Sequence, residues 1–184
     1  MVANLPFKII AWFFIVLLAF LTVILQTSLI SAWPQFFNQL NLVLIVLTIN
    51  LFFSDLKSTL ILTLLLGFWL DLNSFQFFGF YLLSLFATVL LATWLLKNWL
   101  TNRSLYSFLA ISLILTVFYN FWVAILLFLS VGNQTTFFLG ENYFWSNLIY
   151  QLIWSLIAAV LSFNVLAFLT QKLRPGFLEK KHRL

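Results

Sequence analysis

The stretch Gly67-Phe68-Trp69-Leu70-Asp71-Leu72, followed by Gly79-Phe80-Tyr81-Leu82-Leu83, places one carboxylate and two glycines in sequence that is otherwise apolar enough for lipid. An ionisable residue near membrane depth costs about 2.5 to 3.5 kcal/mol on insertion scales, so its presence requires a reason. Gly67 and Gly79 lack a Cβ atom and would allow two helices to approach closely, or the chain to reverse tightly, on either side of Asp71. The fold is therefore expected to turn at this point.

The composition indicates an integral membrane protein. The chain has 184 residues, of which 64% are hydrophobic and 7% are charged, far from the balance of a soluble domain. It contains no Cys, which excludes disulfides and thiolate metal sites. His182 is the only His and lies in a basic tail, where a single imidazole makes no metal site. We therefore expect neither a metal nor a cofactor.

Apolar runs separated by short polar breaks predict an all-α bundle of six transmembrane helices in a single domain, 1–184. The runs cover about residues 7–30, 34–53, 58–70, 78–94, 105–129 and 143–169, and a short basic tail follows at 170–184. About 20 apolar residues cross a bilayer, and the second run reaches that length only if its helix begins at Pro34. The third run is short, about 20 Å at 1.5 Å per residue. It must thin the bilayer, extend past Asp71 or be shielded by its neighbours.

The basic residues predict the orientation, because Lys and Arg in short loops are retained on the cytoplasmic side. With the N-terminus inside, all nine fall on that side: Lys8, Lys57, Lys97, Arg103, Lys172, Arg174, Lys180, Lys181 and Arg183. The opposite loops carry only Asp71 and Glu141. The net charge of +5 thus reflects membrane orientation and does not indicate nucleic acid. Both termini are expected to be cytoplasmic, and an even number of spans is required.

Two alternatives concern the first three runs. A re-entrant pair built from the second and third runs would leave the chain ends unchanged while burying Asp55 and Lys57 at mid-depth. The first run could also be read as a signal peptide. Its apolar core, however, exceeds the 7 to 15 residues typical of such segments, and no small-residue cleavage site follows. We expect an uncleaved anchor.

Few residues could carry out catalysis. The outer loops offer two acids, Asp71 and Glu141, without a His, Cys or basic partner, and phosphate-binding, zinc-protease and serine-hydrolase motifs are absent. The chain is therefore not expected to be an enzyme. Five polar residues fall within the spans and are expected to bond to neighbouring helices: Gln26, Asn50, Asn120, Gln151 and Asn164. The alternative is a small polar pocket, for which Tyr119, Asn120 and Trp122 form the best-suited cluster.

Asp71 follows the last apolar turn of the third run, where a carboxylate faces an unfavourable helix dipole unless a donor compensates it. We expect such a donor from backbone N–H groups of the following turn or from a neighbouring chain. The alternative is that Asp71 is simply a hydrated loop acid.

These residues resemble a known family. Gly67-x-x-x-Asp71-Leu72, then six residues and Gly79 before an apolar helix, is similar to the central signature of the rod shape-determining membrane protein family MreD. The resemblance extends to the chain length, the six short-looped helices, Asn41-Leu42-Val43-Leu44 and Phe144-Trp145-Ser146 before the basic end Gln171-Lys172-Leu173-Arg174. The chain departs from the family pattern at Pro34, which lies further upstream, and at the bulky Phe75-Gln76-Phe77-Phe78.

The resemblance implies a function. It implies a non-enzymatic scaffold subunit of the bacterial cell-elongation machinery, located in the cytoplasmic (inner) membrane. Its partners would be an MreC-like single-span protein and, indirectly, the actin-like MreB and the elongation-specific peptidoglycan synthase. Gly67, Asp71 and Gly79 would be the structural and partner-contact residues. MreD-like proteins are also similar in fold to the substrate-binding subunits of energy-coupling-factor transporters, so the alternative is a binder of a vitamin or another small molecule.

Overall fold

In the computed structural model the described part of the chain is all-helical, which confirms the all-α fold class. The structure describes residues 5–30, 32, 38–98, 105–131 and 142–172, and their side chains at 15–28, 30, 32, 38–98, 105–130 and 145–165. The elements are α1 (Leu5–Ile24), the π-helical η1 (Leu25–Ile30), α2 (Leu42–Phe53), α3 (Leu56–Leu72), α4 (Phe80–Asn98), α5 (Leu105–Val131) and α7 (Asn142–Lys172). Most of the predicted tail 170–184 lies outside the described residues.

Three helices are long and apolar enough to cross a membrane: α4, the stretch Leu105–Ser130 of α5 and the stretch Trp145–Val165 of α7. The described apolar stretch Ile15–Ser28 and α2 are shorter. The 12 residues of α2 span about 18 Å, against a hydrocarbon core of about 30 Å. Membrane-spanning helices are thus supported, whereas the count of six spans stays a prediction.

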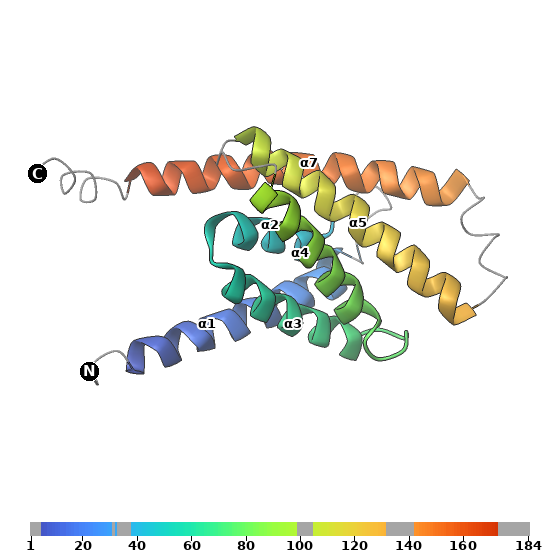
Figure 1. Ribbon diagram of the computed structural model, residues 1–184, viewed down its shortest axis with the longest axis horizontal. Helices are drawn as coiled ribbons and strands as arrows, with labels where there is room; N and C mark the ends of the chain where they lie inside the picture. Colours follow the sequence, from blue (N-terminus) through green and yellow to red (C-terminus); the bar gives the residue numbers. More distant parts are fainter. Residues whose placement is uncertain (1–4, 31, 33–37, 99–104, 132–141, 173–184) are drawn as a thin grey trace, which may run out of the picture.

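The helices run back and forth between two ends of the molecule (Figure 1). The start of α1, the turn between α2 and α3 and the end of α7 lie toward one end, and the loop between α3 and α4 lies toward the other. Neighbours along the chain pack together, α3 on α4, α4 on α5 and α5 on α7, while α1 packs on α3 and α2 on α5. This arrangement places the start of α4 directly beside the end of α3.

The interior combines large apolar side chains with small hydroxyl residues. Leu47, Leu66 and Phe108 are fully buried. Buried threonines on α2, α3, α4 and α5 each donate to the carbonyl four residues earlier: Thr48, Thr63, Thr88 and Thr116. These hydroxyls therefore satisfy themselves within their own helix, and their small size lets neighbouring helices approach closely.

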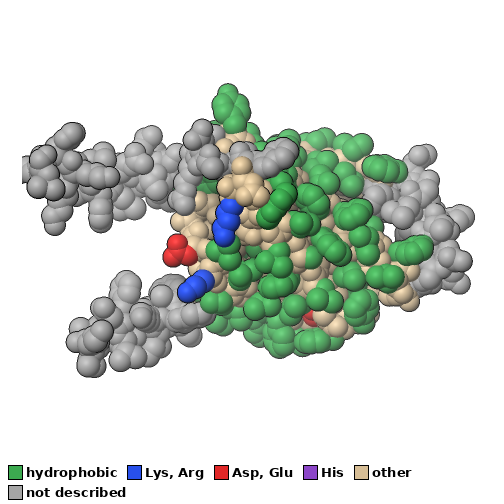
Figure 2. All heavy atoms as spheres, in the orientation of Figure 1, with side chains coloured by type: hydrophobic (Ala, Val, Ile, Leu, Met, Phe, Trp, Pro, Cys, Tyr) green, Lys and Arg blue, Asp and Glu red, His purple; other side chains and the backbone are tan. Residues whose placement is uncertain are grey.

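The outer surface is apolar as well. Many Leu, Ile, Val and Phe side chains are more than a third exposed, and Figure 2 shows hydrophobic side chains over most of the described surface. A soluble monomer rarely exposes contiguous apolar surface beyond a few hundred Å². Lys57, near the start of α3, and Lys97, near the end of α4, are exposed, as is Asp55. The blue spheres of Lys lie toward one end of the molecule in Figure 2.

The second helix begins at Leu42, so the prediction that it starts at Pro34 was wrong; Pro34 itself lies outside the described residues. Asn41 is the N-cap, and its side chain accepts from the Leu44 N–H at 3.3 Å. Gln26 reinforces this start, since its Nε2 donates to the Leu40 carbonyl and its Oε1 accepts from the Leu42 N–H. Polar side chains thus fix the first turn of α2.

The third helix extends past Asp71 and ends at Leu72, two residues beyond its predicted end and with an earlier start at Leu56. It has 17 residues, about 26 Å in length. Of the three possibilities considered for the short third run, extension past Asp71 is the one observed. Asp71 therefore belongs to the last helical turn and not to a loop.

Candidate functional site at the junction of α3 and α4

Asp71 joins the end of α3 to the start of α4. Its side chain is 4% exposed and accepts three backbone hydrogen bonds from the chain that follows. Oδ1 accepts from the Tyr81 N–H at 2.8 Å, and Oδ2 accepts from the N–H groups of Gly79 at 3.0 Å and Leu82 at 3.3 Å. The alternative of a hydrated loop acid is contradicted by this burial, and the expected backbone donors are confirmed.

The carboxylate acts as a cap that is supplied by the preceding helix. The first N–H groups of a helix have no partner within it, and here Asp71 takes those of Tyr81 and Leu82 in the first turn of α4. The N-terminus of a helix carries a partial positive charge, which attracts a carboxylate. Although Asp71 belongs to the C-terminal turn of α3, its charge is therefore stabilised by the N-terminus of α4.

The carbonyl groups at the end of α3 have donors of their own. Asn73 Nδ2 donates to the Trp69 carbonyl at 2.8 Å, and Ser74 Oγ donates to the Asp71 carbonyl at 3.1 Å. The Ser74 N–H also points to the Asp71 carbonyl. These bonds satisfy the last carbonyl groups of α3. They therefore weaken the negative end of the helix dipole, which was expected to disfavour a carboxylate at Asp71.

Gly67 provides the close approach of the two helices. It is buried one turn before Asp71, and a Cβ atom built on it would lie 2.6 Å from the Leu82 Cα. Residues four apart lie on the same face of a helix, so Gly67 and Asp71 meet the first turn of α4 together. One residue, Leu82, contacts both, through its Cα and through its N–H.

Gly79 serves a different purpose. Its φ angle is +97°, a region that L-amino acids rarely adopt, and a Cβ atom added there would meet nothing within 4 Å. The glycine is therefore needed for its backbone conformation and not for space. That conformation directs the Gly79 N–H at Asp71 while the chain turns into α4.

Other polar side chains gather at this end of the bundle. Tyr119 of α5 lies near Asn41 at the start of α2, and Tyr81 lies within electrostatic reach of both Asp71 and Tyr119. Gln39 Nε2 donates to Asn147 Oδ1 on α7 at 2.9 Å. Sequence reasoning missed the roles of Tyr81, Leu82 and Asn41, although an Asn immediately before an apolar run is a recognised cap signal.

The three residues of the predicted cluster, Tyr119, Asn120 and Trp122, have different neighbours. Tyr119 lies near Asn41 of α2, whereas Asn120 Nδ2 donates to Gln151 Oε1 on α7 at 2.8 Å and to the Thr116 carbonyl. Trp122 Nε1 is buried and has no acceptor among the described residues. Successive helical residues point about 100° apart, which is why adjacent positions face different neighbours.

Most of the polar residues within the spans bond to other elements, as expected. Gln26 reaches the start of α2, Asn50 Oδ1 accepts from Thr59 Oγ1 of α3 at 3.0 Å, and Asn120 and Gln151 bond to each other. Asn164 is the exception, because its side chain is exposed on α7 and has no hydrogen-bond partner among the described residues. The prediction for Asn164 was wrong.

The loop between α3 and α4 presents aromatic side chains outward. Phe75 is fully exposed, Phe78 is 65% exposed and Leu72 is 55% exposed. Phe77 and Phe78 also make ring contacts with Phe80 and Phe68, at centroid distances of 5.4 and 6.0 Å. We refer to Leu72, Phe75 and Phe78 as the aromatic edge. Asp71 and Gly79 bracket it and fix both of its ends.

Comparisons with protein-family models, with curated proteins and with solved structures find no match for this chain.

Proposed function

We propose that this chain is a non-enzymatic membrane scaffold subunit of the bacterial cell-elongation machinery, as the resemblance to MreD implies. In this role it binds an MreC-like single-span protein and so helps to position lateral-wall peptidoglycan synthesis, in which MreB and the elongation-specific synthase take part. It is a multi-pass protein of the cytoplasmic membrane with six spans and both termini inside.

The main support for this proposal is the structural role of Asp71 and its two glycines at the junction of α3 and α4. All three residues of the family-like motif act on the backbone: Gly67 admits Leu82, Gly79 adopts a positive φ angle, and both Asp71 oxygens accept N–H bonds. A buried carboxylate that is occupied in this way is suited to holding a shape and not to proton transfer. The shape that it holds includes the aromatic edge, an apolar surface of the kind that protein partners use.

The charge distribution supports the orientation. Lys57 and Lys97 are exposed at the ends of α3 and α4 away from the Asp71 junction. If basic residues are retained in the cytoplasm, the junction and its aromatic edge face the outer side. A single-span partner with an outer domain could reach them there.

The alternative, a substrate-binding subunit of a small-molecule transporter, draws on the polar side chains near the same end. Asn41 accepts from the Leu44 N–H, and Asn120 and Gln151 bond to each other, so a ligand would have to displace those bonds. This pairing favours the scaffold. The depletion experiment described next distinguishes the transporter from the scaffold.

The test is co-purification of the tagged chain with an MreC-like protein of the same cell, together with depletion. We expect a stable complex in mild detergent, and rounded or swollen cells on depletion. Cells that kept their rod shape but required one added vitamin would replace the scaffold by the transporter. Reporter fusions after Leu184 and within 131–142 test the orientation, and a signal on the outer side at Leu184 would contradict it.

A further inference from the structure

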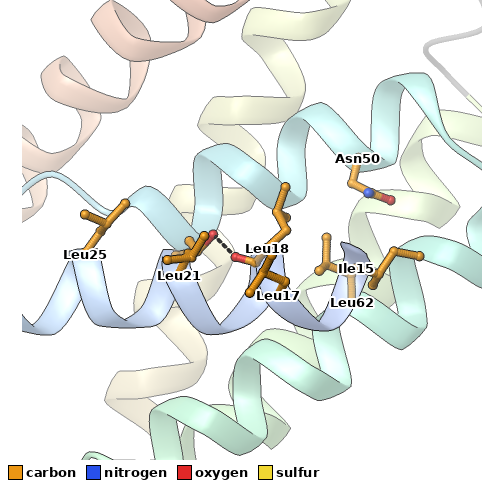
Figure 3. A pocket seen from close by; sticks show the side chains of 8 residues that line it. Ile15, Leu17, Leu18, Leu21, Leu25, Asn50 and Leu62 are labelled. Atoms are coloured by element: carbon orange, nitrogen blue, oxygen red, sulfur yellow. Dashed lines mark hydrogen bonds between the residues drawn. The ribbon is translucent and has the colours of Figure 1, made fainter. Parts of the chain in front are cut away.

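An apolar groove of about 520 Å³ runs along α1 on the side where α2 and α3 approach it (Figure 3). Its wall is formed by Ile15, Leu18, Leu21 and Leu25 along α1 and the start of η1, and by Leu62 of α3. Thr22 also lines it, but its hydroxyl donates to the Leu18 carbonyl at 2.7 Å and so needs no further partner. Apart from Asn50, the lining is therefore apolar.

The length of the groove corresponds to half of a bilayer. Ile15 and Leu25 are ten residues apart, or about 15 Å at 1.5 Å per residue. The hydrocarbon core of a bilayer is about 30 Å thick, so each leaflet contributes about 15 Å. Leu18, Leu21 and Leu25, which line the groove, are exposed, as expected for a surface that is open to lipid. A single acyl chain matches this dimension.

Asn50 of α2 is the polar group of the groove. Its Oδ1 accepts from Thr59 Oγ1, but its Nδ2 has no acceptor anywhere in the described part of the chain. Figure 3 shows Asn50 of α2 at the end of the groove where Ile15 and Leu62 lie. An unpaired N–H donor in an apolar medium costs roughly 1 to 3 kcal/mol. A bound acceptor oxygen at this point would remove that cost.

The charges near the Asn50 end complement a phospholipid headgroup. Lys57 lies in the first turn of α3, at the end of the molecule where α1 also begins, and it is exposed. Asp55, in the adjoining turn, is exposed and would pair with an ammonium group. A zwitterionic headgroup matches both signs, whereas a free anion matches only one.

We propose that this groove binds one zwitterionic glycerophospholipid, with an acyl chain along Ile15 to Leu25, an ester carbonyl on Asn50 Nδ2 and the phosphate beside Lys57. Lipid tails are as apolar as Leu, so the apolar wall alone gives no preference over bulk lipid. The Asn50 donor distinguishes the site. This inference does not depend on the proposed scaffold role.

Native mass spectrometry of the delipidated full chain, titrated with phosphatidylethanolamine, tests the site. Wild type should retain one lipid. Asn50→Leu should bind it roughly three- to tenfold more weakly, the effect of one hydrogen bond. Leu21→Trp, which fills the groove, should reduce binding to background. Leu161→Trp, at an exposed position on α7, is the matched control and should bind as wild type does.

Several results would overturn the proposal. They are equal retention in wild type, Asn50→Leu and Leu21→Trp; retention of a free fatty acid in place of the diacyl lipid; and a preference for phosphatidylglycerol over phosphatidylethanolamine. Helix content and the unfolding midpoint in detergent are measured for every variant. If Asn50→Leu does not fold, Leu21→Trp, which leaves the Asn50 to Thr59 bond intact, decides the matter.

Discussion

Gly67 and Leu82 stand so close that a Cβ atom on Gly67 would lie 2.6 Å from the Leu82 Cα and 3.1 Å from its Cβ. The contact is therefore between backbones, and trimming the Leu82 side chain cannot relieve it. The same Leu82 donates its N–H to Asp71 one turn further along α3. Any shift of α4 away from Gly67 would consequently stretch the hydrogen bonds to Asp71 as well.

We expect Gly67→Ala to destabilise the protein. Alanine favours a helix by about 1 kcal/mol over glycine, but overpacking costs about 1 to 3 kcal/mol, so the net loss should be up to about 2 kcal/mol. The free energy of unfolding in mixed micelles measures it. The double variant Gly67→Ala with Leu82→Ala should remain at least as unstable, because the Leu82 Cα is unmoved. If Gly67→Ala instead increased the free energy of unfolding, α4 would be able to move away from α3 without loss of stability.

Substitutions of Asp71 should be graded. Asn retains one acceptor oxygen and places an NH₂ group against at least one N–H donor, so it keeps at most two of the three bonds. Leu keeps none. Each buried N–H left unpaired costs about 1 to 3 kcal/mol, so Asp71→Leu should lose more stability than Asp71→Asn, and both should lose stability relative to wild type.

Asp55→Asn is the matched control for that series. Asp55 is the exposed N-cap residue of α3, and its side chain makes no capping hydrogen bond. The same substitution there should change the free energy of unfolding by less than about 0.5 kcal/mol, as surface changes usually do. Equal effects of Asn at positions 55 and 71 would mean that charge, and not the buried bonds, accounts for the loss.

The stability of Gly79 variants should depend on how readily the new residue adopts a positive φ angle, and not on the size of its side chain. At φ +97° an L-residue costs about 1 to 2 kcal/mol, and nothing lies within 4 Å of the added Cβ atom. Gly79→Ala and Gly79→Ser should therefore be destabilised equally, Gly79→Asn less so, and the β-branched Gly79→Val most. Unfolding midpoints in detergent distinguish this order from a steric series, in which Asn would be worse than Ala.

The sequence predicted the location of this junction but not its electrostatics. The spacing of Gly67, Asp71 and Gly79 marked a turn between two helices, and the structure has one there. Asp71 was expected to be disfavoured by the C-terminal dipole of its own helix, and the favourable N-terminal dipole of α4 was not foreseen. The donors come from residues eight to eleven positions later, and their direction depends on how α4 packs on α3, which periodicity does not contain.

The start of α2 was missed for a related reason. The length needed to cross a bilayer favoured Pro34 as the first residue, and the capping signal at Asn41 was not considered. Gln26, which holds both Leu40 and Leu42, lies in η1 and comes near only in the folded chain. In contrast, the sequence was sufficient to predict that Tyr119 and Asn120 face different neighbours, because adjacent residues of a helix point in different directions.

Gln26→Leu should loosen the first turn of α2. It removes an acceptor from the Leu42 N–H, bonded at 2.7 Å, and a donor from the Leu40 carbonyl, bonded at 3.1 Å. Hydrogen–deuterium exchange of residues 38–44 should accelerate, while the backbone around the fully buried Leu115 of α5 stays protected. Gln76→Leu changes an exposed Gln of the α3–α4 loop and should leave this exchange unchanged. No change with Gln26→Leu would show that Asn41 alone suffices as a cap.

The last prediction concerns the aromatic edge and rests on the proposed scaffold role. Phe75 is fully exposed, so Phe75→Ser should leave the unfolding midpoint unaltered while lowering recovery of the MreC-like partner by about tenfold or more, the range of a buried aromatic contact. Tyr106→Ser is the control, because Tyr106 is an exposed aromatic residue on the first turn of α5, away from the junction. Asp71→Leu should also lower recovery, but together with stability. If Phe75→Ser retains the partner while Asp71→Leu loses it, the junction acts through the fold of the bundle and the partner binds another surface.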